Sequence, residues 1–412
     1  MREVVIIGVG MHKFGRFLSE SLKDLGRVAV WNAIHDADID AKAIDAAYVS
    51  NGLAGVITGQ EGIRGQIILC HAGLSGIPIV NVEGACASGT IALREAWIAI
   101  GSGICDVVLA LGVEKMYSGD TSKVLKALAA DSDVETESAM GLQFSALYAM
   151  NLRKFMQKYG WTQEDFAKVT VKNRYHGSLN PYAQYQKRIT TKEVLDSRLI
   201  AYPLTLYMCS SIGDGAAAVI LCAKEVAHKY ARKPLVSIAS CELRTAPFVD
   251  PRKKAATSEE VGLPHIEEGL PYSDLYFQSS VARGAYEKAG IGPEDIGVVE
   301  VHDAMAPAEM MRCIALGFYK AEDAPAWIRE ERSTITGELP VNVSGGLTAR
   351  GHPIGATGLA QISELTWQLR GEANSRQVPG RDKSGPKVGL AQNSGGHAPS
   401  GTAAMTVTIL KR

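Results

Sequence analysis

Short apolar runs alternate along this chain with longer stretches in which apolar residues recur at the spacing of a helix. The apolar runs cover Val4–Ile7, Ala47–Ser50, Ile79–Val82, Val107–Leu111, Ala216–Leu221, Leu235–Ala239, Val298–Val301, Val341–Val343, Val388–Ala391 and Thr402–Leu410. Nearly continuous apolar runs are typical of strands that helices cover on both faces. The helical stretches include Ser88–Ile100, Ser279–Ala289 and Ala356–Leu369. The pattern therefore predicts a layered α/β protein.

Two similar segments indicate that the chain consists of two related halves. Val80–Gly84 reads Val-Asn-Val-Glu-Gly and Val341–Gly345 reads Val-Asn-Val-Ser-Gly, and a glycine-rich helix start follows each segment. A chance match of five residues is the alternative. We predict two halves with one βαβ-type plan, the first made of residues 1–114 and 203–232 and the second of residues 233–412.

The segment between these parts of the first half, residues 115–202, lacks strand signals, and we predict that it is an inserted helical domain. It carries a set of basic side chains: Arg153, Lys154, Lys158, Lys172, Arg174, Lys187 and Arg188. These side chains either form an ordinary solvated surface or belong to a lid that contacts an anionic substrate.

Composition excludes several classes of protein. The 43 basic and 44 acidic residues give a net charge of −1, which provides no long-range attraction for nucleic acid or an anionic membrane. No apolar run approaches the roughly 18 residues of a membrane span, and the N-terminus resembles a buried strand more than a secretory signal. The seven cysteines include no Cys-x-x-Cys pair, so neither a disulfide framework nor a zinc site is indicated. We expect a cytoplasmic protein without a bound metal.

Cys86 is the first candidate for chemistry. It follows the predicted strand Ile79–Val82 and precedes the small residues Ala87–Thr90, which open a predicted helix. A helix N-terminus favours the thiolate and lowers a cysteine pKa, and small neighbours leave room for a substrate carbonyl. A lone cysteine is more often a small buried apolar residue. The strand-turn-helix setting makes a nucleophile an equally strong interpretation.

Three further motifs contain histidine. Gly351–Gly358 reads Gly-His-Pro-Ile-Gly-Ala-Thr-Gly and holds His352 on a loop that is crowded with glycine. His302 and Asp303 follow the predicted strand Val298–Val301, at the edge where open α/β sheets bind ligands. Gln392–His397 follows another predicted strand and reads Gln-Asn-Ser-Gly-Gly-His. Each motif is weak evidence by itself.

In this order the four motifs resemble those of the thiolase family over nearly the whole chain. Gly84–Gly89 is similar to the segment around the acyl-accepting cysteine, Gly351–Gly358 to the most specific signature, and Ser211–Ala218 to the end of the N-terminal half. The resemblance implies a duplicated thiolase fold, an α/β fold with five layers in the order α-β-α-β-α. It also implies that the inserted segment is a loop domain that acts as a lid and contacts coenzyme A.

The thiolase branch is indicated by two further features. His302-Asp303 in place of Asn-Glu, together with Asn180–Ala183 (Asn-Pro-Tyr-Ala), is similar to the sterol-carrier-protein-type and archaeal thiolases. Within this branch the chain resembles thiolase subunits that cleave benzoylsuccinyl-CoA to an aromatic acyl-CoA and succinyl-CoA, and also archaeal acetoacetyl-CoA thiolases. Either resemblance implies coenzyme A as a substrate and no covalently bound cofactor.

The resemblance implies roles for individual residues. Cys86 would be the nucleophile, His352 its base, and His302 the residue that holds the thioester oxygen. The backbone N–H groups of Cys86 and Gly395 would form the oxyanion hole. The second cysteine that thiolases use as an acid and base is absent, because the two places where it occurs read Asn393-Ser394-Gly395 and His302-Asp303-Ala304-Met305. His397, His302 and a water held by Asn393 are the alternatives for that acid.

Two functions besides that of a thiolase stay open. Cys86, His302 and His352 also resemble the catalytic set of decarboxylating ketosynthases, and a non-catalytic partner subunit is a further alternative because the second cysteine is absent. The family resemblance implies a homodimer core, and this branch often pairs with a small zinc-ribbon/OB-fold protein.

Overall fold

The computed structural model describes residues 1–230, 232–247, 274–398 and 401–412 of the chain. Its strands form a nine-stranded sheet of order β3-β2-β4-β7-β1-β8-β11-β10-β9 and a separate two-stranded sheet. The first half of the large sheet contains β1 (Val4–Met11), β2 (Ala46–Ser50), β3 (Ile79–Val82), β4 (Val107–Glu114) and β7 (Gly215–Ala223). The second half contains β8 (Val236–Arg244), β9 (Val298–Glu300), β10 (Val388–Ala398) and β11 (Gly401–Lys411).

The two halves of the sheet repeat one topology. In the first half β3, β2 and β4 are parallel, β7 is antiparallel to β4, and β1 is antiparallel to β7. In the second half β9 and β10 are parallel, β11 is antiparallel to β10, and β8 is antiparallel to β11. Val341 forms a parallel bridge to Val299 beside β9, in the place that β3 occupies in the first half. The repeat predicted from Val80 and Val341 is therefore confirmed.

Two strand predictions differ from the structure. The predicted strand Val341–Val343 is reduced to that single bridge, because Asn342 adopts a left-handed φ of 54° and its side-chain oxygen accepts the N–H of Val301. The prediction that residues 115–202 contain no strand is wrong near their end. There β5 (Leu199–Ala201) pairs with β6 (Leu204–Thr205).

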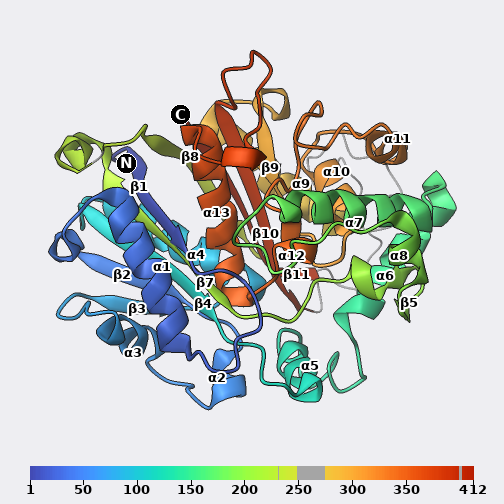
Figure 1. The fold of residues 1–412 in the computed structure, drawn as a ribbon, viewed down its shortest axis with the longest axis horizontal. Coiled ribbons are helices and arrows are strands. Elements are labelled where there is room, and N and C mark those ends of the chain that lie inside the picture. The colour runs from blue at the N-terminus through green and yellow to red at the C-terminus, as the bar shows by residue number, and fades with distance from the viewer. Residues whose placement is uncertain (231, 248–273, 399–400) are drawn as a thin grey trace.

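Helices divide the two halves into five layers, which Figure 1 shows with α13 between the N-terminal and C-terminal strands. The outer layer of the first half contains α1 (Leu22–Ala37) and α3 (Arg64–His71). The central layer contains α4 (Ser88–Gly101) and α13 (Ile354–Arg370), which contact strands of both halves. The outer layer of the second half contains α9 (Asp274–Ala289) and α10 (Ala308–Ala315). A short ladder between β1 and β8 joins the two halves into one sheet.

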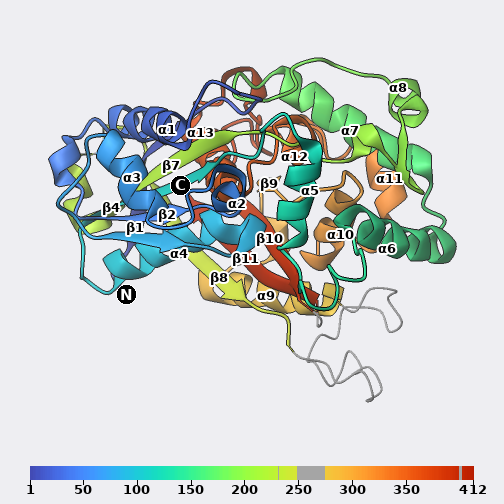
Figure 2. The ribbon, with the colours of Figure 1, turned by 90° about the horizontal axis from the view of Figure 1, so that it is seen from below.

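Most of the inserted segment packs onto the second half of the chain, while its first helix packs against residues 53–57 of the first half (Figure 2). Its helices are α5 (Thr121–Ala129), α6 (Phe144–Tyr159), α7 (Gln163–Ser178) and α8 (Thr191–Asp196). Side chains of α6 and α7 share one apolar cluster with α10 and α11 (Ala324–Arg329). The α-helices α2 (Ala54–Thr58) and α12 (Gly346–Ala349) complete the set found in the described residues. The boundaries of the three proposed domains stay a prediction, and residues 231 and 248–273 within them lie outside the described residues.

None of the helices in the described part of the chain is both long and apolar enough to cross a membrane.

The two central helices approach each other through glycine. A Cβ atom on Gly358 of α13 would lie 2.7 Å from the backbone nitrogen of Thr90 in α4, and one on Gly89 would lie 3.0 Å from the carbonyl oxygen of Gly355. A Cβ on Gly112, near the end of β4, would lie 2.3 Å from the same oxygen. The N-terminal turns of α4 and α13 therefore meet at backbone contact, and no residue with a side chain fits between them.

We expect Gly358→Ala to lower the free energy of unfolding by about 1–3 kcal/mol, because the added methyl group must push α13 away from α4. A chemical denaturation curve measures this change. Gly62→Ala is the control, since a Cβ there meets no atom within 4 Å and Gly62 is exposed. Equal stability of the two variants would show that the helices can separate without loss.

Candidate active site

Cys86 lies in a short turn between β3 and α4. Ala85–Ala87 forms a 3-10 turn, and Ala85 adopts a left-handed φ of 48°, which costs about 1 kcal/mol for a residue with a Cβ. Two side chains hold the turn. The Glu83 carboxylate accepts the N–H of Ala85 at 2.6 Å, and the Ser88 hydroxyl accepts the N–H of Gly84 at 2.9 Å. Cys86 is thereby fixed directly before the first turn of α4.

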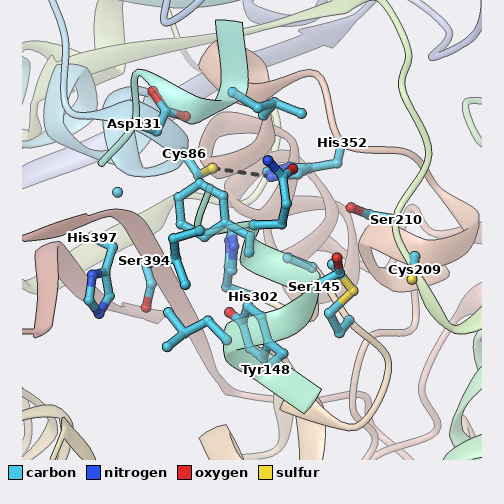
Figure 3. A pocket seen from close by; sticks show the side chains of 18 of the residues that line it. Cys86, Asp131, Ser145, Tyr148, Cys209, Ser210, His302, His352, Ser394 and His397 are labelled. Atoms are coloured by element: carbon cyan, nitrogen blue, oxygen red, sulfur yellow. Dashed lines mark hydrogen bonds between the residues drawn. The ribbon is translucent and has the colours of Figure 1, made fainter. Parts of the chain in front are cut away.

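His352 reaches Cys86 from the other half of the chain. Its Nε2 atom lies 3.3 Å from the Cys86 Sγ atom (Figure 3). Its Nδ1 atom lies 2.7 Å from Oγ1 of Thr357. The Thr357 hydroxyl donates its own hydrogen to the carbonyl oxygen of Pro353 at 3.0 Å. It must therefore accept from Nδ1–H of His352, which leaves Nε2 without a hydrogen. Nε2 is then free to accept the proton of Cys86.

Burial keeps both members of this pair neutral. The surrounding protein raises the pKa of Cys86 well above its usual value, and the charges of Asp131 and Glu114 add to this effect. Burial and the neighbouring Arg350 lower the pKa of His352 to about 3. The backbone N–H groups of Cys86 and Gly396 lower the cysteine pKa, as the sequence predicted for a helix N-terminus, but desolvation is the larger effect and the net pKa is raised. The resting state is a thiol beside a neutral imidazole.

His302 completes the group that the sequence predicted. It follows β9, and its ring meets that of His352 edge to face at a centroid distance of 5.1 Å. Burial and His352 lower the pKa of His302 well below its usual value, so this ring is also neutral. Its Nδ1 atom has no hydrogen-bond partner among the described residues. The His302 ring lines the cavity, and a neutral imidazole carries one N–H group that can donate to a substrate oxygen.

The ligand atoms of Cys86, His302 and His352 lie within 4.8 Å of one another, close enough to hold an ion. Two of these three atoms already pair with each other through the hydrogen bond between Cys86 and His352. We interpret the group as an acid-base site because that contact and the fixed tautomer of His352 suit proton transfer.

Asn393 and Gly395 of β10, which the sequence predicted for the site, differ from each other in their surroundings. Asn393 donates to Oε1 of Gln361 at 3.0 Å and raises the pKa of His302, so it lies beside that ring. Gly395 packs against the turn that carries Cys86, where an added Cβ would lie 2.1 Å from the carbonyl oxygen of Gly84. The backbone N–H that lowers the pKa of Cys86 from β10 belongs to Gly396. The oxyanion role of Gly395 stays a prediction, and sequence reasoning missed Gly396, whose N–H acts on the Cys86 sulfur.

His397 does not join the group around Cys86. Its Nδ1 atom pairs with a carboxylate oxygen of Glu137 at 2.9 Å, and Figure 3 shows its ring beyond Ser394 as seen from His302. The sequence could not reveal this pair, because Glu137 lies in the inserted segment. Its contact makes His397 a weaker candidate for the acid than the sequence suggested.

A cavity of about 270 Å³ opens beside Cys86, His302 and His352. The inserted segment supplies much of its wall, including Leu125, Leu128, Asp131, Phe144, Leu147 and Tyr148. Sequence reasoning treated this segment as a basic lid and missed these residues. The amphipathic spacing of Leu125 and Leu128 in a predicted helix was the available signal.

The sequence of the chain matches known protein families in both halves. Residues 4–225 match the protein family described as "Thiolase, N-terminal domain". Residues 273–412 match the family described as "Thiolase C-terminal domain-like". The chain belongs to the thiolase family. This membership confirms the α/β thiolase fold and the class of enzyme, a thiolase-type acyltransferase.

Several relatives match this thiolase over most of its length. The acetyl-CoA acetyltransferase of Methanothermobacter thermautotrophicus is 41% identical over 407 residues, which is 99% of each chain. Benzoylsuccinyl-CoA thiolase subunit BbsB of Thauera aromatica is 35% identical over 397 residues, 96% of this chain and 95% of that protein. A solved Ltp2-ChsH2(DUF35) aldolase has the same fold, with a TM-score of 0.77 at 22% identity over 98% of this chain and 97% of that chain.

Thr357→Val should slow the alkylation of Cys86 by iodoacetamide about five- to tenfold. The valine cannot accept from His352, and a hydrogen bond of this kind contributes about 1 kcal/mol. Alkylation of Cys86 followed by peptide mass spectrometry measures the rate. Thr357→Ser keeps the hydroxyl and should react like the wild type. If valine and serine react alike, another group fixes the imidazole.

Proposed function

We propose that this thiolase cleaves or forms a β-ketoacyl-CoA through an acyl-Cys86 intermediate. The observation that carries the proposal is the 3.3 Å contact between Cys86 Sγ and Nε2 of His352, with the hydrogen of His352 held on Nδ1 by Thr357. A thiol beside a neutral imidazole becomes a nucleophile at the moment when the imidazole accepts its proton.

Thiolysis then proceeds in two stages. His352 accepts the proton of Cys86, and the sulfur attacks the keto carbon of the substrate. The bond between this carbon and the α carbon breaks, and its electron pair leaves as the enolate of a shorter acyl-CoA. The enolate takes up a proton from an acid of the site, and the conjugate base of this acid later accepts the thiol proton of coenzyme A. Coenzyme A then attacks acyl-Cys86, and the cysteine sulfur recovers its proton from His352.

Two groups of donors support the charges that form on oxygen. The keto oxygen becomes an alkoxide beside the backbone N–H of Cys86 and that of Gly395 or Gly396, where the loss of one donor typically raises a barrier by about 2.7–4 kcal/mol. The enolate oxygen is held by His302 with Asn393 beside it. The neutral state of His302 suits this role, because it can donate a hydrogen bond without carrying a charge.

The lining of the cavity favours a substrate whose acyl group is larger than acetyl. Its wall contains Leu125, Leu128, Leu142, Phe144 and Leu147, and such apolar walls favour extended apolar or aromatic acyl groups. Benzoylsuccinyl-CoA, with its aromatic ketone, fits this chemistry. Acetoacetyl-CoA is the second candidate, favoured by the 41% identity to an acetyl-CoA acetyltransferase.

The inserted segment is proposed to contact coenzyme A as a lid. Arg188 is exposed and stacks on Tyr175 at 4.3 Å, so one basic group of the segment is held in a fixed position at the protein surface, whereas Arg174 of α7 is buried and stacks on Tyr185 at 4.0 Å. Phosphate groups of a nucleotide are the anions that such guanidinium groups suit. A small zinc-ribbon/OB-fold partner is also proposed, since one structural neighbour is a complex with a DUF35 protein.

A ketosynthase or a non-catalytic subunit fits the site less well. A decarboxylating ketosynthase would release carbon dioxide from a malonyl thioester, and this release distinguishes it from a thiolase. A non-catalytic subunit has no need of the paired Cys86 and His352. Labelling of Cys86 that acyl-CoA blocks would count against a non-catalytic role.

Cys86→Ala should abolish both acyl-enzyme formation and thiolysis while the fold persists, because the thiol is the group that accepts the acyl chain. Intact-protein mass spectrometry after mixing with β-ketoacyl-CoA substrates, from acetoacetyl to aromatic, should show the added acyl mass in the wild type. Larger acyl groups should give the higher kcat/KM. Cys70→Ala, which changes an exposed cysteine, is the control. Acyl mass on the Cys86→Ala protein would assign the nucleophile elsewhere.

A dimer is proposed because β3 is an edge strand with an exposed apolar residue. Val80 is 47% exposed at the outer edge of the first half, directly before the turn of Cys86. An edge of this kind is a template for pairing with another strand, and closed two-fold assemblies are the commonest.

Light scattering should therefore give a mass near twice the 44.0 kDa of one chain at micromolar concentration. Val80→Lys should shift the protein toward the monomer, because a charge on the edge opposes strand pairing. Lys42→Gln, which changes the charge at another exposed residue, is the control. A wild-type mass of one chain would overturn the dimer.

A further inference from the structure

A carboxyl group of the inserted segment lies in the wall of the Cys86 cavity. Asp131 follows the end of α5 and lines the cavity together with Cys86, His302 and His352. Its Oδ2 atom is fully buried and has no hydrogen-bond partner among the described residues. Figure 3 shows Asp131 beside Cys86, on the side opposite His302. A buried carboxyl oxygen without a hydrogen-bond partner lowers the stability of the fold, and such a group calls for a functional explanation.

The main chain of Asp131 is fixed at both of its polar atoms. Its N–H donates to the carbonyl oxygen of Leu128, in the last turn of α5, at 3.1 Å. Its carbonyl oxygen accepts the N–H of His397 at 2.8 Å. A Cβ on Gly396 would lie 3.1 Å from the same carbonyl oxygen. Asp131 is therefore held between the inserted segment and β10, directly beside the glycine whose N–H faces the sulfur.

The environment of Asp131 favours its protonated form. Burial and the nearby carboxylates of Glu83 and Glu114 raise its pKa to about 8. At neutral pH it is thus a carboxylic acid that can release a proton to a stronger base. In the neutral form it also adds no negative charge beside the Cys86 sulfur.

The other titratable groups of the cavity are poorer proton donors. The pKa values of His302 and His352 are lowered, so both rings are neutral, and burial raises the pKa of Cys209 to about 12. Burial also raises the pKa of Tyr148, and its hydroxyl pairs with Arg312. His397 pairs with Glu137.

We propose that Asp131 is the general acid and base of the reaction, in the place of the absent second cysteine; this rests on the proposed thiolase function. Its O–H bond breaks as a C–H bond forms at the α carbon of the departing enolate. The resulting carboxylate then takes the proton of the coenzyme A thiol while that sulfur attacks the carbonyl carbon of acyl-Cys86. The carboxylic acid is regenerated, and Cys86 recovers its proton from His352.

Asp131→Asn keeps the shape of the side chain and removes the transferable proton. It should lower kcat of thiolysis by about 10²–10⁴, the usual contribution of a positioned general acid. It should also abolish the exchange of α hydrogens of the acyl-CoA product in D2O, which reports the same proton transfer in reverse. Alkylation of Cys86 by iodoacetamide should be unchanged at pH 7 and faster above pH 8, because the charge that raises the cysteine pKa is gone.

The pH profile adds a second readout. The groups that face Asp131 are Glu83, Glu114, Cys86 and the pair of His397 with Glu137. The wild-type profile of kcat should bend near pH 8, and Asp131→Asn should lose that bend. Asp131→Glu keeps the acid and should retain a bend together with intermediate turnover, which also decides the question if the asparagine variant does not fold.

Glu135→Gln is the matched control, because it makes the same change at an exposed carboxyl of the same segment. Its turnover should equal that of the wild type. Full turnover and exchange in Asp131→Asn would overturn the proposal while acyl-Cys86 in the wild type still supported a thiolase. Equal loss of turnover and alkylation would indicate a structural role and also overturn it. A wild type that forms no acyl-enzyme would overturn both proposals.

Discussion

The close contact between α4 and α13 is the constraint on which the site depends. Cys86 stands before the first turn of α4 and His352 before the first turn of α13, so the separation of these two turns sets the distance between sulfur and imidazole. Gly89, Gly355 and Gly358 allow the backbones to touch. Duplication of one fold unit produces this arrangement, because each half supplies one central helix and one chemical group to the same point.

Burial at this point determines the charge states, and buried carboxylates hold the loops that carry the catalytic groups. Glu114 accepts the N–H groups of Gly52 and Gly355, at 2.9 and 3.0 Å, and so ties the end of β4 to the start of α13. Glu300 accepts the N–H of Ser344 at 2.9 Å in the second half. Low polarity around Cys86 and His352 disfavours both ions, so charge appears in the site when the substrate reacts.

Sequence reasoning predicted the sheet and the repeat, because strand patterning and glycine motifs are local signals. The association of Cys86, His352 and His302 was implied by the resemblance to thiolases. Sequence reasoning failed where the outcome depends on distant residues. The pKa of Cys86 is raised because desolvation exceeds the effect of the helix N-terminus, and desolvation depends on the whole fold. Asn342 ends a strand through its own left-handed backbone, which the run Val341–Val343 does not reveal. His397 pairs with Glu137, which is distant in the sequence, so no local pattern reveals this contact.

Reaction chemistry and substrate choice are carried by different parts of the chain. Cys86 and His352, the proposed nucleophile and base, belong to the duplicated core, where an added Cβ at Gly89 or Gly358 would meet the backbone of the neighbouring helix. The cavity wall belongs largely to α5, α6 and their connections, while other side chains of these two helices pack into apolar clusters. Substitutions at Leu125 or Phe144 can therefore alter the shape of the cavity without moving α4 against α13. A fold with this division can accept new acyl groups while Cys86 and His352 keep their contact.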